Sequence, residues 1–125
     1  MIAGIGVDIT DIARIRILLE KHGLRFMQRI LTADEIGFCK KRHDQATCVA
    51  GRFAAKEAAF KALSSGRASG IAFKDIEIET ADGSPRLNLT GKALTRATQM
   101  GVCRFHLSIS HDHGCAVAVV ILETA

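Results

Sequence analysis

Several residue types that point to particular classes of protein are scarce in this sequence. It has no tryptophan or tyrosine and only six phenylalanines among 125 residues, so it offers few surfaces on which nucleic acid bases could stack. No apolar stretch approaches the length of a membrane span, and the amino-terminal segment lacks the basic leader and apolar run of a secretory signal. We therefore expect a cytoplasmic protein that binds neither nucleic acid nor membrane.

The cysteines also lack a recognisable pattern. None of them stands in the CxxC spacing of a zinc or redox site. Such scattered cysteines are typical of buried, reduced thiols in a cytoplasmic protein rather than of a disulfide framework. We expect all four to be free thiols, namely Cys39, Cys48, Cys103 and Cys115.

The overall composition fits a single domain that spans residues 1–125. Hydrophobic residues make up 48% of the chain and charged residues 24%, which is ordinary for a domain that folds around its own core. The net charge of +4 is unevenly spread, because the segment from Arg14 to Arg42 holds eight Lys or Arg and only three Asp or Glu. This segment indicates either an acidic partner or phosphate-rich ligand, or a solvated helical face.

Alternation, turn residues and capping signals predict the order of helices and strands. The predicted strands are residues 1–9, 76–80, 86–89, 102–110 and 115–122, with turns at 81–83 and 111–114. The predicted helices are residues 11–23, a helix opened by the capping box at 32–35, a long helix over 45–63 that ends at Ser64-Ser65-Gly66, and residues 90–100. Because strands and helices do not alternate regularly, we expect an α+β fold in which a mainly antiparallel sheet packs with a long central helix.

Asp8 is notable because glycines clear the same face of the first predicted strand. Gly4 and Gly6 alternate with apolar residues and therefore point to the same side as Asp8. Another backbone or a ligand can approach the strand closely there, since glycine has no side chain. Tight packing or a bulge would account for the glycines but not for the carboxylate. We interpret Asp8 as a functional residue.

The long predicted helix carries charges in an otherwise buried sequence, RFAAKEAAFKAL. Glu57 and Lys61 are four residues apart and stack along one edge of its apolar face. A surface ion pair is one interpretation. The alternative is that Glu57 joins Asp8 as a second oxygen ligand of the kind that magnesium takes. With Lys61 and Arg52 beside them, these residues are the components of metal-assisted phosphoryl transfer.

Four segments carry a resemblance to a known family. They are GIGVDITDI at residues 4–12, RILTADE at 29–35, GRFAAKEAAFKAL at 51–63 and HLSISHDHGCAVAVVIL at 106–122. In this order, and almost end to end, the chain resembles the holo-[acyl-carrier-protein] synthases, the small bacterial class of 4′-phosphopantetheinyl transferases. The resemblance implies the 4′-phosphopantetheinyl transferase fold and transfer of the 4′-phosphopantetheine arm of coenzyme A to a serine of apo acyl carrier protein. The other product would be adenosine 3′,5′-bisphosphate.

The resemblance also implies roles for individual residues. Asp8 and Glu57 correspond to the magnesium ligands of the family. Lys61 corresponds to a lysine that faces the phosphates of coenzyme A, where it would neutralise charge on the leaving group. Arg52 and His111 correspond to residues on the coenzyme A side. Family members form homotrimers with coenzyme A at the subunit interfaces.

Two further expectations concern the attacking serine and the carrier protein. Glu35 is a candidate for the base that removes the serine proton, and equally for the capping residue of its own helix. Arg14, Lys21 and Arg25 would share one side of the first helix if that helix continued past Gly23. Such a basic stripe would steer association with an acidic acyl carrier protein.

Two alternative functions use the same residues. One is a non-catalytic module that binds an acidic protein, or less favourably nucleic acid, through the basic segment; the other is a different magnesium-dependent phosphotransferase or hydrolase. We interpret His111-Asp112-His113 as turn residues rather than as a transition-metal site. The sequence assigns no role to Lys56, which falls among core positions. Nor does it fix how Gly114-Cys115, where family members commonly carry an aromatic residue, affects the coenzyme A pocket.

Overall fold

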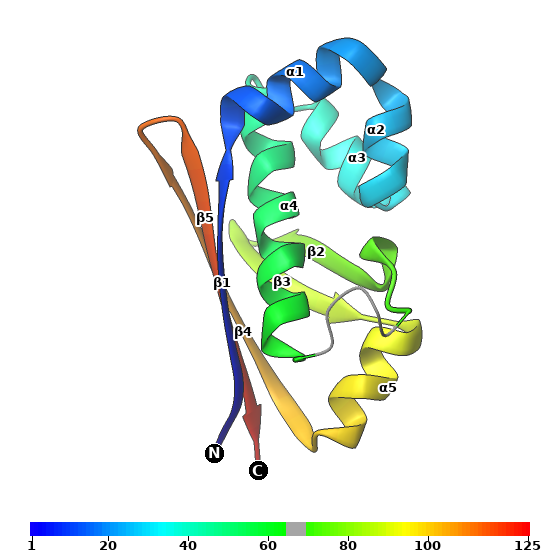
Figure 1. Cartoon of the computed structure of the whole chain (residues 1–125), viewed down its shortest axis with the longest axis vertical. Helices are drawn as coiled ribbons and strands as arrows, with labels where there is room; N and C mark the ends of the chain where they lie inside the picture. Colours follow the sequence, from blue (N-terminus) through cyan, green and yellow to red (C-terminus); the bar gives the residue numbers. More distant parts are fainter. Residues whose placement is uncertain (65–69) are drawn as a thin grey trace.

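The computed structural model describes residues 1–64 and 70–125, and its elements follow the predicted order (Figure 1). The strands are β1 (Ile2–Asp11), β2 (Ile76–Ala81), β3 (Ser84–Leu89), β4 (Val102–Asp112) and β5 (Cys115–Thr124). The helices are α1 (Ile12–His22), α2 (Leu24–Ile30), α3 (Ala33–Lys40), α4 (Gln45–Ala62), α5 (Gly91–Gln99) and a 3-10 turn, η2 (Phe73–Asp75). The long predicted helix ends one residue early, and Ser65 and Gly66 lie outside the described residues.

Both sheets are antiparallel, which confirms the predicted α+β class. One sheet has the strand order β1-β5-β4, and the other is the β2–β3 hairpin. The central helix α4 lies along one face of the three-stranded sheet, with α1, α2 and α3 gathered at one of its ends and α5 near the other (Figure 1). The main core therefore forms between α4, the sheet and the hairpin, where the alanines of α4 are fully buried. None of the described helices is long and apolar enough to cross a membrane.

The glycines of β1 allow its backbone to touch the backbone of α4. A Cβ atom added at Gly4 would overlap the carbonyl oxygen of Ala62, and one added at Gly6 would overlap that of Ala58. The sequence left open whether a ligand or another backbone approaches these glycines. In the structure it is the backbone of α4. Gly4 lies against Ala62 and Gly6 against Ala58, so β1 runs toward the amino-terminal end of α4. Asp8, two residues after Gly6, therefore also points toward α4 and lies closer to that end.

Caps and turns fix the ends of several elements. The Asp11 side chain accepts a hydrogen bond from the amide of Ala13 at 3.0 Å and so caps α1. The β4–β5 turn is shorter than predicted, because β4 continues to Asp112. His113 and Gly114 both have positive φ angles, 49° and 77°, which is the backbone that a two-residue hairpin requires.

The amino-terminal half confirms one expectation and contradicts another. The first helix ends at Gly23, as predicted, so the condition for a continuous basic stripe is not met and a separate helix, α2, carries Arg25. Cys39 and Cys48 are not free thiols but form a disulfide with Cα atoms 5.5 Å apart. Their spacing of nine residues gave no signal because the pairing depends on the turn that returns the chain from α3 to α4.

We predict that Gly6→Ala destabilises the fold by about 3 kcal/mol or more, because the new methyl group has to push α4 away from β1. The matched control is Gly37→Ala in α3, where nothing lies within 4 Å of an added Cβ. That change should stabilise the protein by about 0.5–1 kcal/mol through helix propensity. Urea unfolding of both variants measures the difference. Equal effects would contradict the close β1–α4 contact.

Candidate active site

A cavity of about 660 Å³ opens where α1 and α2 face β1 and α4. Its wall combines three kinds of side chain. Three carboxylates come from β1 and α4, four basic side chains come from α1 and α2, and apolar side chains fill the space between. The principal lining residues are Asp8, Thr10, Asp11, Arg14, Ile15, Leu18, His22, Arg25, Phe26, Arg29, Ile30, Phe53, Glu57 and Phe73.

Asp8 is held in this cavity by contacts to both of its carboxylate oxygens. The Thr10 hydroxyl donates to Oδ2 at 3.1 Å, and the Lys61 ammonium donates to Oδ1 at 3.2 Å. Lys61 also donates to the carbonyl oxygen of Val7 at 2.9 Å. Glu57 lines the same cavity from the preceding turn of α4. The structure therefore brings together the three residues that the sequence singled out, Asp8, Glu57 and Lys61.

The two carboxylates fit the requirements of a magnesium ion. Magnesium takes hard oxygen ligands and is commonly bound through one or two carboxylates, with waters and substrate phosphate completing its shell. Asp8 and Glu57 face one cavity that has room for a phosphate group. No group of three or more His, Cys, Asp or Glu side chains suited to a metal occurs among the described residues. The donor set thus favours a hard, partly hydrated cation over a transition metal.

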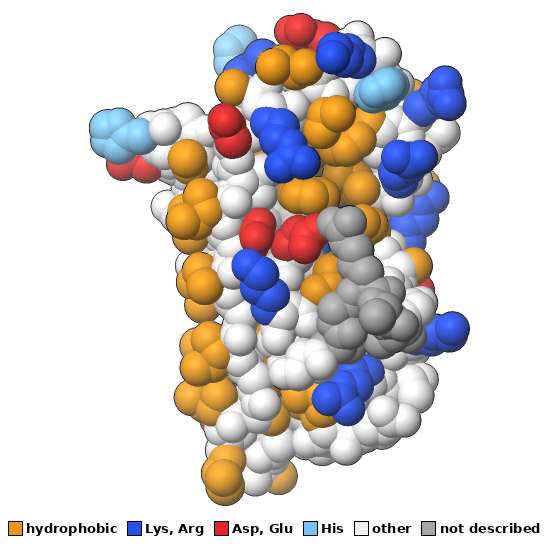
Figure 2. All heavy atoms as spheres, in the orientation of Figure 1, with side chains coloured by type: hydrophobic (Ala, Val, Ile, Leu, Met, Phe, Trp, Pro, Cys, Tyr) orange, Lys and Arg blue, Asp and Glu red, His pale blue; other side chains and the backbone are white. Residues whose placement is uncertain are grey.

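Basic side chains line the part of the cavity formed by α1 and α2. Arg14 and His22 come from α1, and Arg25 and Arg29 come from α2. Lys21 is exposed and is not among the lining residues, so the expected stripe of Arg14, Lys21 and Arg25 along one helix is not present. On the face seen in Figure 2, acidic side chains gather near mid-height, with Lys or Arg above and below them.

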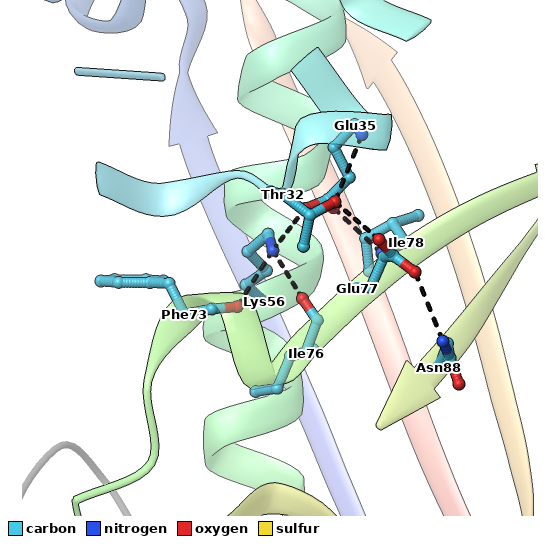
Figure 3. A network of polar contacts seen from close by, with 8 residues as sticks. All are labelled: Thr32, Glu35, Lys56, Phe73, Ile76, Glu77, Ile78 and Asn88. Carbon is cyan, nitrogen blue, oxygen red and sulfur yellow. Dashed lines mark hydrogen bonds and ion pairs between the residues drawn. The ribbon is translucent and has the colours of Figure 1, made fainter. Parts of the chain in front are cut away.

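Glu35 belongs to a buried polar network outside the cavity (Figure 3). Its Oε1 accepts hydrogen bonds from the backbone amide of Thr32 and the ammonium of Lys56, each at 2.8 Å, and its Oε2 accepts one from the amide of Ile78 at 3.0 Å. The side chains of Glu35 and Lys56 are both 0% exposed. Thr32 completes a capping box at the start of α3.

This geometry corrects the assignment of Glu35 as a base. Its carboxylate is closed off from solvent and engaged by three donors, so it cannot reach a serine bound in the cavity. The capping interpretation is the one that the structure supports.

The network also gives Lys56 a role. Its ammonium donates to Glu35 and to the backbone carbonyls of Phe73 and Ile76, which ties α4 to α3, η2 and β2 (Figure 3). Burial lowers the pKa of Lys56, and the Glu35 carboxylate opposes that shift. Because Phe73 packs against Phe53 with ring centroids 5.8 Å apart, and both rings line the cavity, the network supports one wall of the site.

Arg52 and His111 do not line the cavity. Arg52 is buried, donates to the Thr80 hydroxyl at 2.8 Å and lies over the Phe38 ring, with its Cζ 4.2 Å from the ring centroid. Burial lowers its pKa. His111 is exposed near the end of β4.

Sequence reasoning missed several lining residues. His22, Arg29, Phe53 and Phe73 were not singled out, although Arg29 and Phe53 lie in segments that carried the family resemblance. They come from α1, α2, α4 and η2, so that only the packing of these elements shows them to share one cavity.

The fold and this site define the class of protein. The sequence pattern of the 4′-phosphopantetheinyl transferase superfamily matches residues 4–118. A holo-[acyl-carrier-protein] synthase of Maridesulfovibrio salexigens is 51% identical over 124 residues, which cover 98% of this chain and 99% of the relative. Another, from Clostridium kluyveri, is 49% identical over 124 residues, covering 98% and 91%. The chain therefore belongs to the holo-[acyl-carrier-protein] synthases of this superfamily.

Solved structures agree with this placement. The holo-[acyl-carrier-protein] synthase of Neisseria meningitidis superimposes with a TM-score of 0.88 at 36% identity, and the match covers 99% of this chain and 100% of that structure's chain. The enzyme of Helicobacter pylori in complex with coenzyme A gives a TM-score of 0.83 at 35% identity, covering 95% and 99%. The likeness thus extends over the whole domain.

Proposed function

We propose that the cavity between Asp8 and the basic side chains of α1 and α2 is where this chain transfers the 4′-phosphopantetheine arm of coenzyme A to a serine of apo acyl carrier protein. The observation that carries the proposal is that Asp8 and Glu57 line one cavity, with Lys61 bound to Asp8, in a chain of the holo-[acyl-carrier-protein] synthase family. The second product is adenosine 3′,5′-bisphosphate. Since the reaction uses coenzyme A and carrier proteins of intracellular biosynthesis, we place the enzyme in the cytoplasm.

The side chains divide the work of the reaction between them. Asp8 and Glu57 would hold magnesium, which when bound supplies positive charge to the pyrophosphate oxygens. Thr10 fixes the orientation of Asp8 through its hydrogen bond to Oδ2. Lys61, whose side chain reaches Asp8, would neutralise negative charge on the departing phosphate. The rings of Phe53 and Phe73 keep water from one wall of the cavity.

We predict that Glu57→Gln lowers the rate of transfer by roughly a hundredfold or more, because an amide carries no charge for the metal. The assay mixes the enzyme with coenzyme A, magnesium and apo carrier protein, and mass spectrometry detects the carrier with the added arm. The matched control is Glu20→Gln, an exposed carboxylate on α1 outside the cavity, which should leave the rate unchanged. If the unmodified enzyme transfers nothing to any of several carriers, a non-catalytic binding module becomes the better description.

We also propose that acidic acyl carrier protein docks on the basic side chains around the cavity, with Arg14 and Arg25 at its rim and Lys21 as an exposed neighbour. Acidic groups of a carrier would approach these side chains with favourable electrostatic energy. Docking there would bring the carrier serine to the cavity that holds Asp8 and Glu57. The position of the basic rim supports this orientation.

Arg14→Glu should therefore raise KM for the carrier roughly fivefold or more, while KM for coenzyme A changes little. The rise should shrink as salt concentration increases, since screening weakens the attraction that the variant has lost. Steady-state kinetics with each substrate varied in turn provide the measurement. Equal increases for carrier and coenzyme A would argue against a docking role for Arg14.

Finally, we propose that the enzyme is a homotrimer. The face of β1 turned away from α4 exposes Ile2, Ile5, Val7 and Ile9 by 50% or more, and an apolar stripe of this kind favours contact with another chain. A subunit contact would also let His111, which is exposed and lies off the cavity of its own chain, reach coenzyme A bound across an interface. Sedimentation equilibrium should give three times the mass of one 13.5 kDa chain, and a monomer would refute this assembly.

A further inference from the structure

Lys61 contacts one of the two carboxylate oxygens that Asp8 could offer to a metal. Its ammonium lies 3.2 Å from Oδ1 of Asp8 and 2.9 Å from the carbonyl oxygen of Val7. The other carboxylate oxygen, Oδ2, already accepts the hydrogen bond of Thr10. A cation entering the cavity and the ammonium of Lys61 therefore compete for the same carboxylate oxygen.

We propose that Lys61 is an internal counter-ion of Asp8 that the divalent metal displaces, and that this displacement frees the lysine to turn toward the phosphate substrate. The inference rests on the proposed function, because it assigns the metal to Asp8 and Glu57. It adds a sequence of events to that assignment. Before metal binds, Lys61 neutralises Asp8; afterwards, the metal does so and the ammonium is available to the substrate.

The exposure of the two side chains makes this exchange feasible. The Lys61 side chain is 55% exposed, whereas that of Asp8 is 17% exposed, so the lysine can leave into solvent while the carboxylate stays in place. A partly exposed ion pair of this kind is weak and is held by a long, flexible arm. An ammonium and a divalent cation on the same carboxylate also repel each other, which favours release of the weaker ligand.

Lys56, on the same helix, is a lysine held in place by its surroundings and can be compared with Lys61. It stands five residues before Lys61, is 0% exposed and donates to three oxygens, from Glu35, Phe73 and Ile76. Removing it from those partners would leave buried charges unpaired. Lys61, by comparison, is 55% exposed and, among the described residues, has a single carboxylate partner, Asp8, as a side chain that can move would.

The first experiment measures metal binding without any turnover. Mn²⁺, which prefers the same oxygen ligands, is titrated into the purified enzyme without coenzyme A, and electron paramagnetic resonance counts the free ion. Lys61→Met should bind Mn²⁺ roughly two- to tenfold more tightly than the unmodified enzyme, because the competing cation is gone. Lys61→Arg keeps a cation at this position and should bind Mn²⁺ more weakly than Lys61→Met. Unchanged or weaker binding by Lys61→Met would overturn the proposal.

Two controls separate this inference from the proposed function. Lys92→Met removes the same charge from an exposed position on α5, outside the cavity, and should not change the affinity for Mn²⁺. Tightening in that variant equal to that of Lys61→Met would mean that only net charge matters, against the proposal. Asp8→Asn should abolish tight binding. If Asp8→Asn still binds Mn²⁺ tightly, the metal site and the proposed function fail together. If Asp8→Asn loses binding but Lys61→Met does not bind more tightly, only the role of the lysine is rejected.

The second experiment tests the release toward substrate. The affinity for coenzyme A is measured with and without saturating metal. Metal should raise it in the unmodified enzyme, in part because the freed Lys61 can then meet a phosphate. Binding linkage requires the reciprocal effect on metal affinity. In Lys61→Met, the gain in affinity for coenzyme A should be smaller than in the unmodified enzyme by roughly threefold or more. An undiminished gain would contradict the movement of Lys61 toward the phosphates.

Discussion

The backbone contact between β1 and α4 determines where the chemistry of this protein can occur. Gly4 and Gly6 let the strand approach the carbonyl oxygens of Ala62 and Ala58, at a distance that no side chain on β1 would permit. The contact also fixes the relative position of the two elements along their length. Asp8 follows these glycines on the same face and is thereby delivered to the part of α4 from which Lys61 reaches it. Two segments separated by some fifty residues of sequence thus form one site.

The charged side chains of α4 lie in two different environments. Arg52 and Lys56 are buried toward the β2–β3 hairpin and the end of α3, where they find oxygen, sulfur and aromatic partners. Glu57 lines the cavity instead, and Lys61 reaches Asp8. The buried Lys56–Glu35 pair is not evidence of exceptional stability, because desolvation offsets much of the attraction between the two charges. Its clearer effect is on geometry, since it joins four elements around one wall of the cavity.

Much of the fold and part of the site follow from local features of the sequence. The Asp82-Gly83 and His113-Gly114 pairs favour two-residue hairpins, and both turns have the required positive φ angles. Thr32 and Glu35 form the predicted capping box. The glycines before Asp8 marked a close approach that the structure contains. The sequence also placed the end of the first helix at Gly23, but it did not predict the separate helix α2 that follows and carries Arg25 and Arg29 to the cavity.

By itself, the sequence determined the strands, the helices other than α2 and η2, their order and the residues able to carry charge chemistry, because caps, turns and alternation act between near neighbours in the chain. Only the tertiary structure decided which of those charges serve the site. It enclosed Glu35 with Lys56, placed Arg52 against Phe38 and paired Cys39 with Cys48. It left Asp8 and Glu57 in a shared cavity, with Lys61 bound to Asp8. These outcomes depend on distances between segments remote in sequence, and such distances are set by how the helices and sheet pack together.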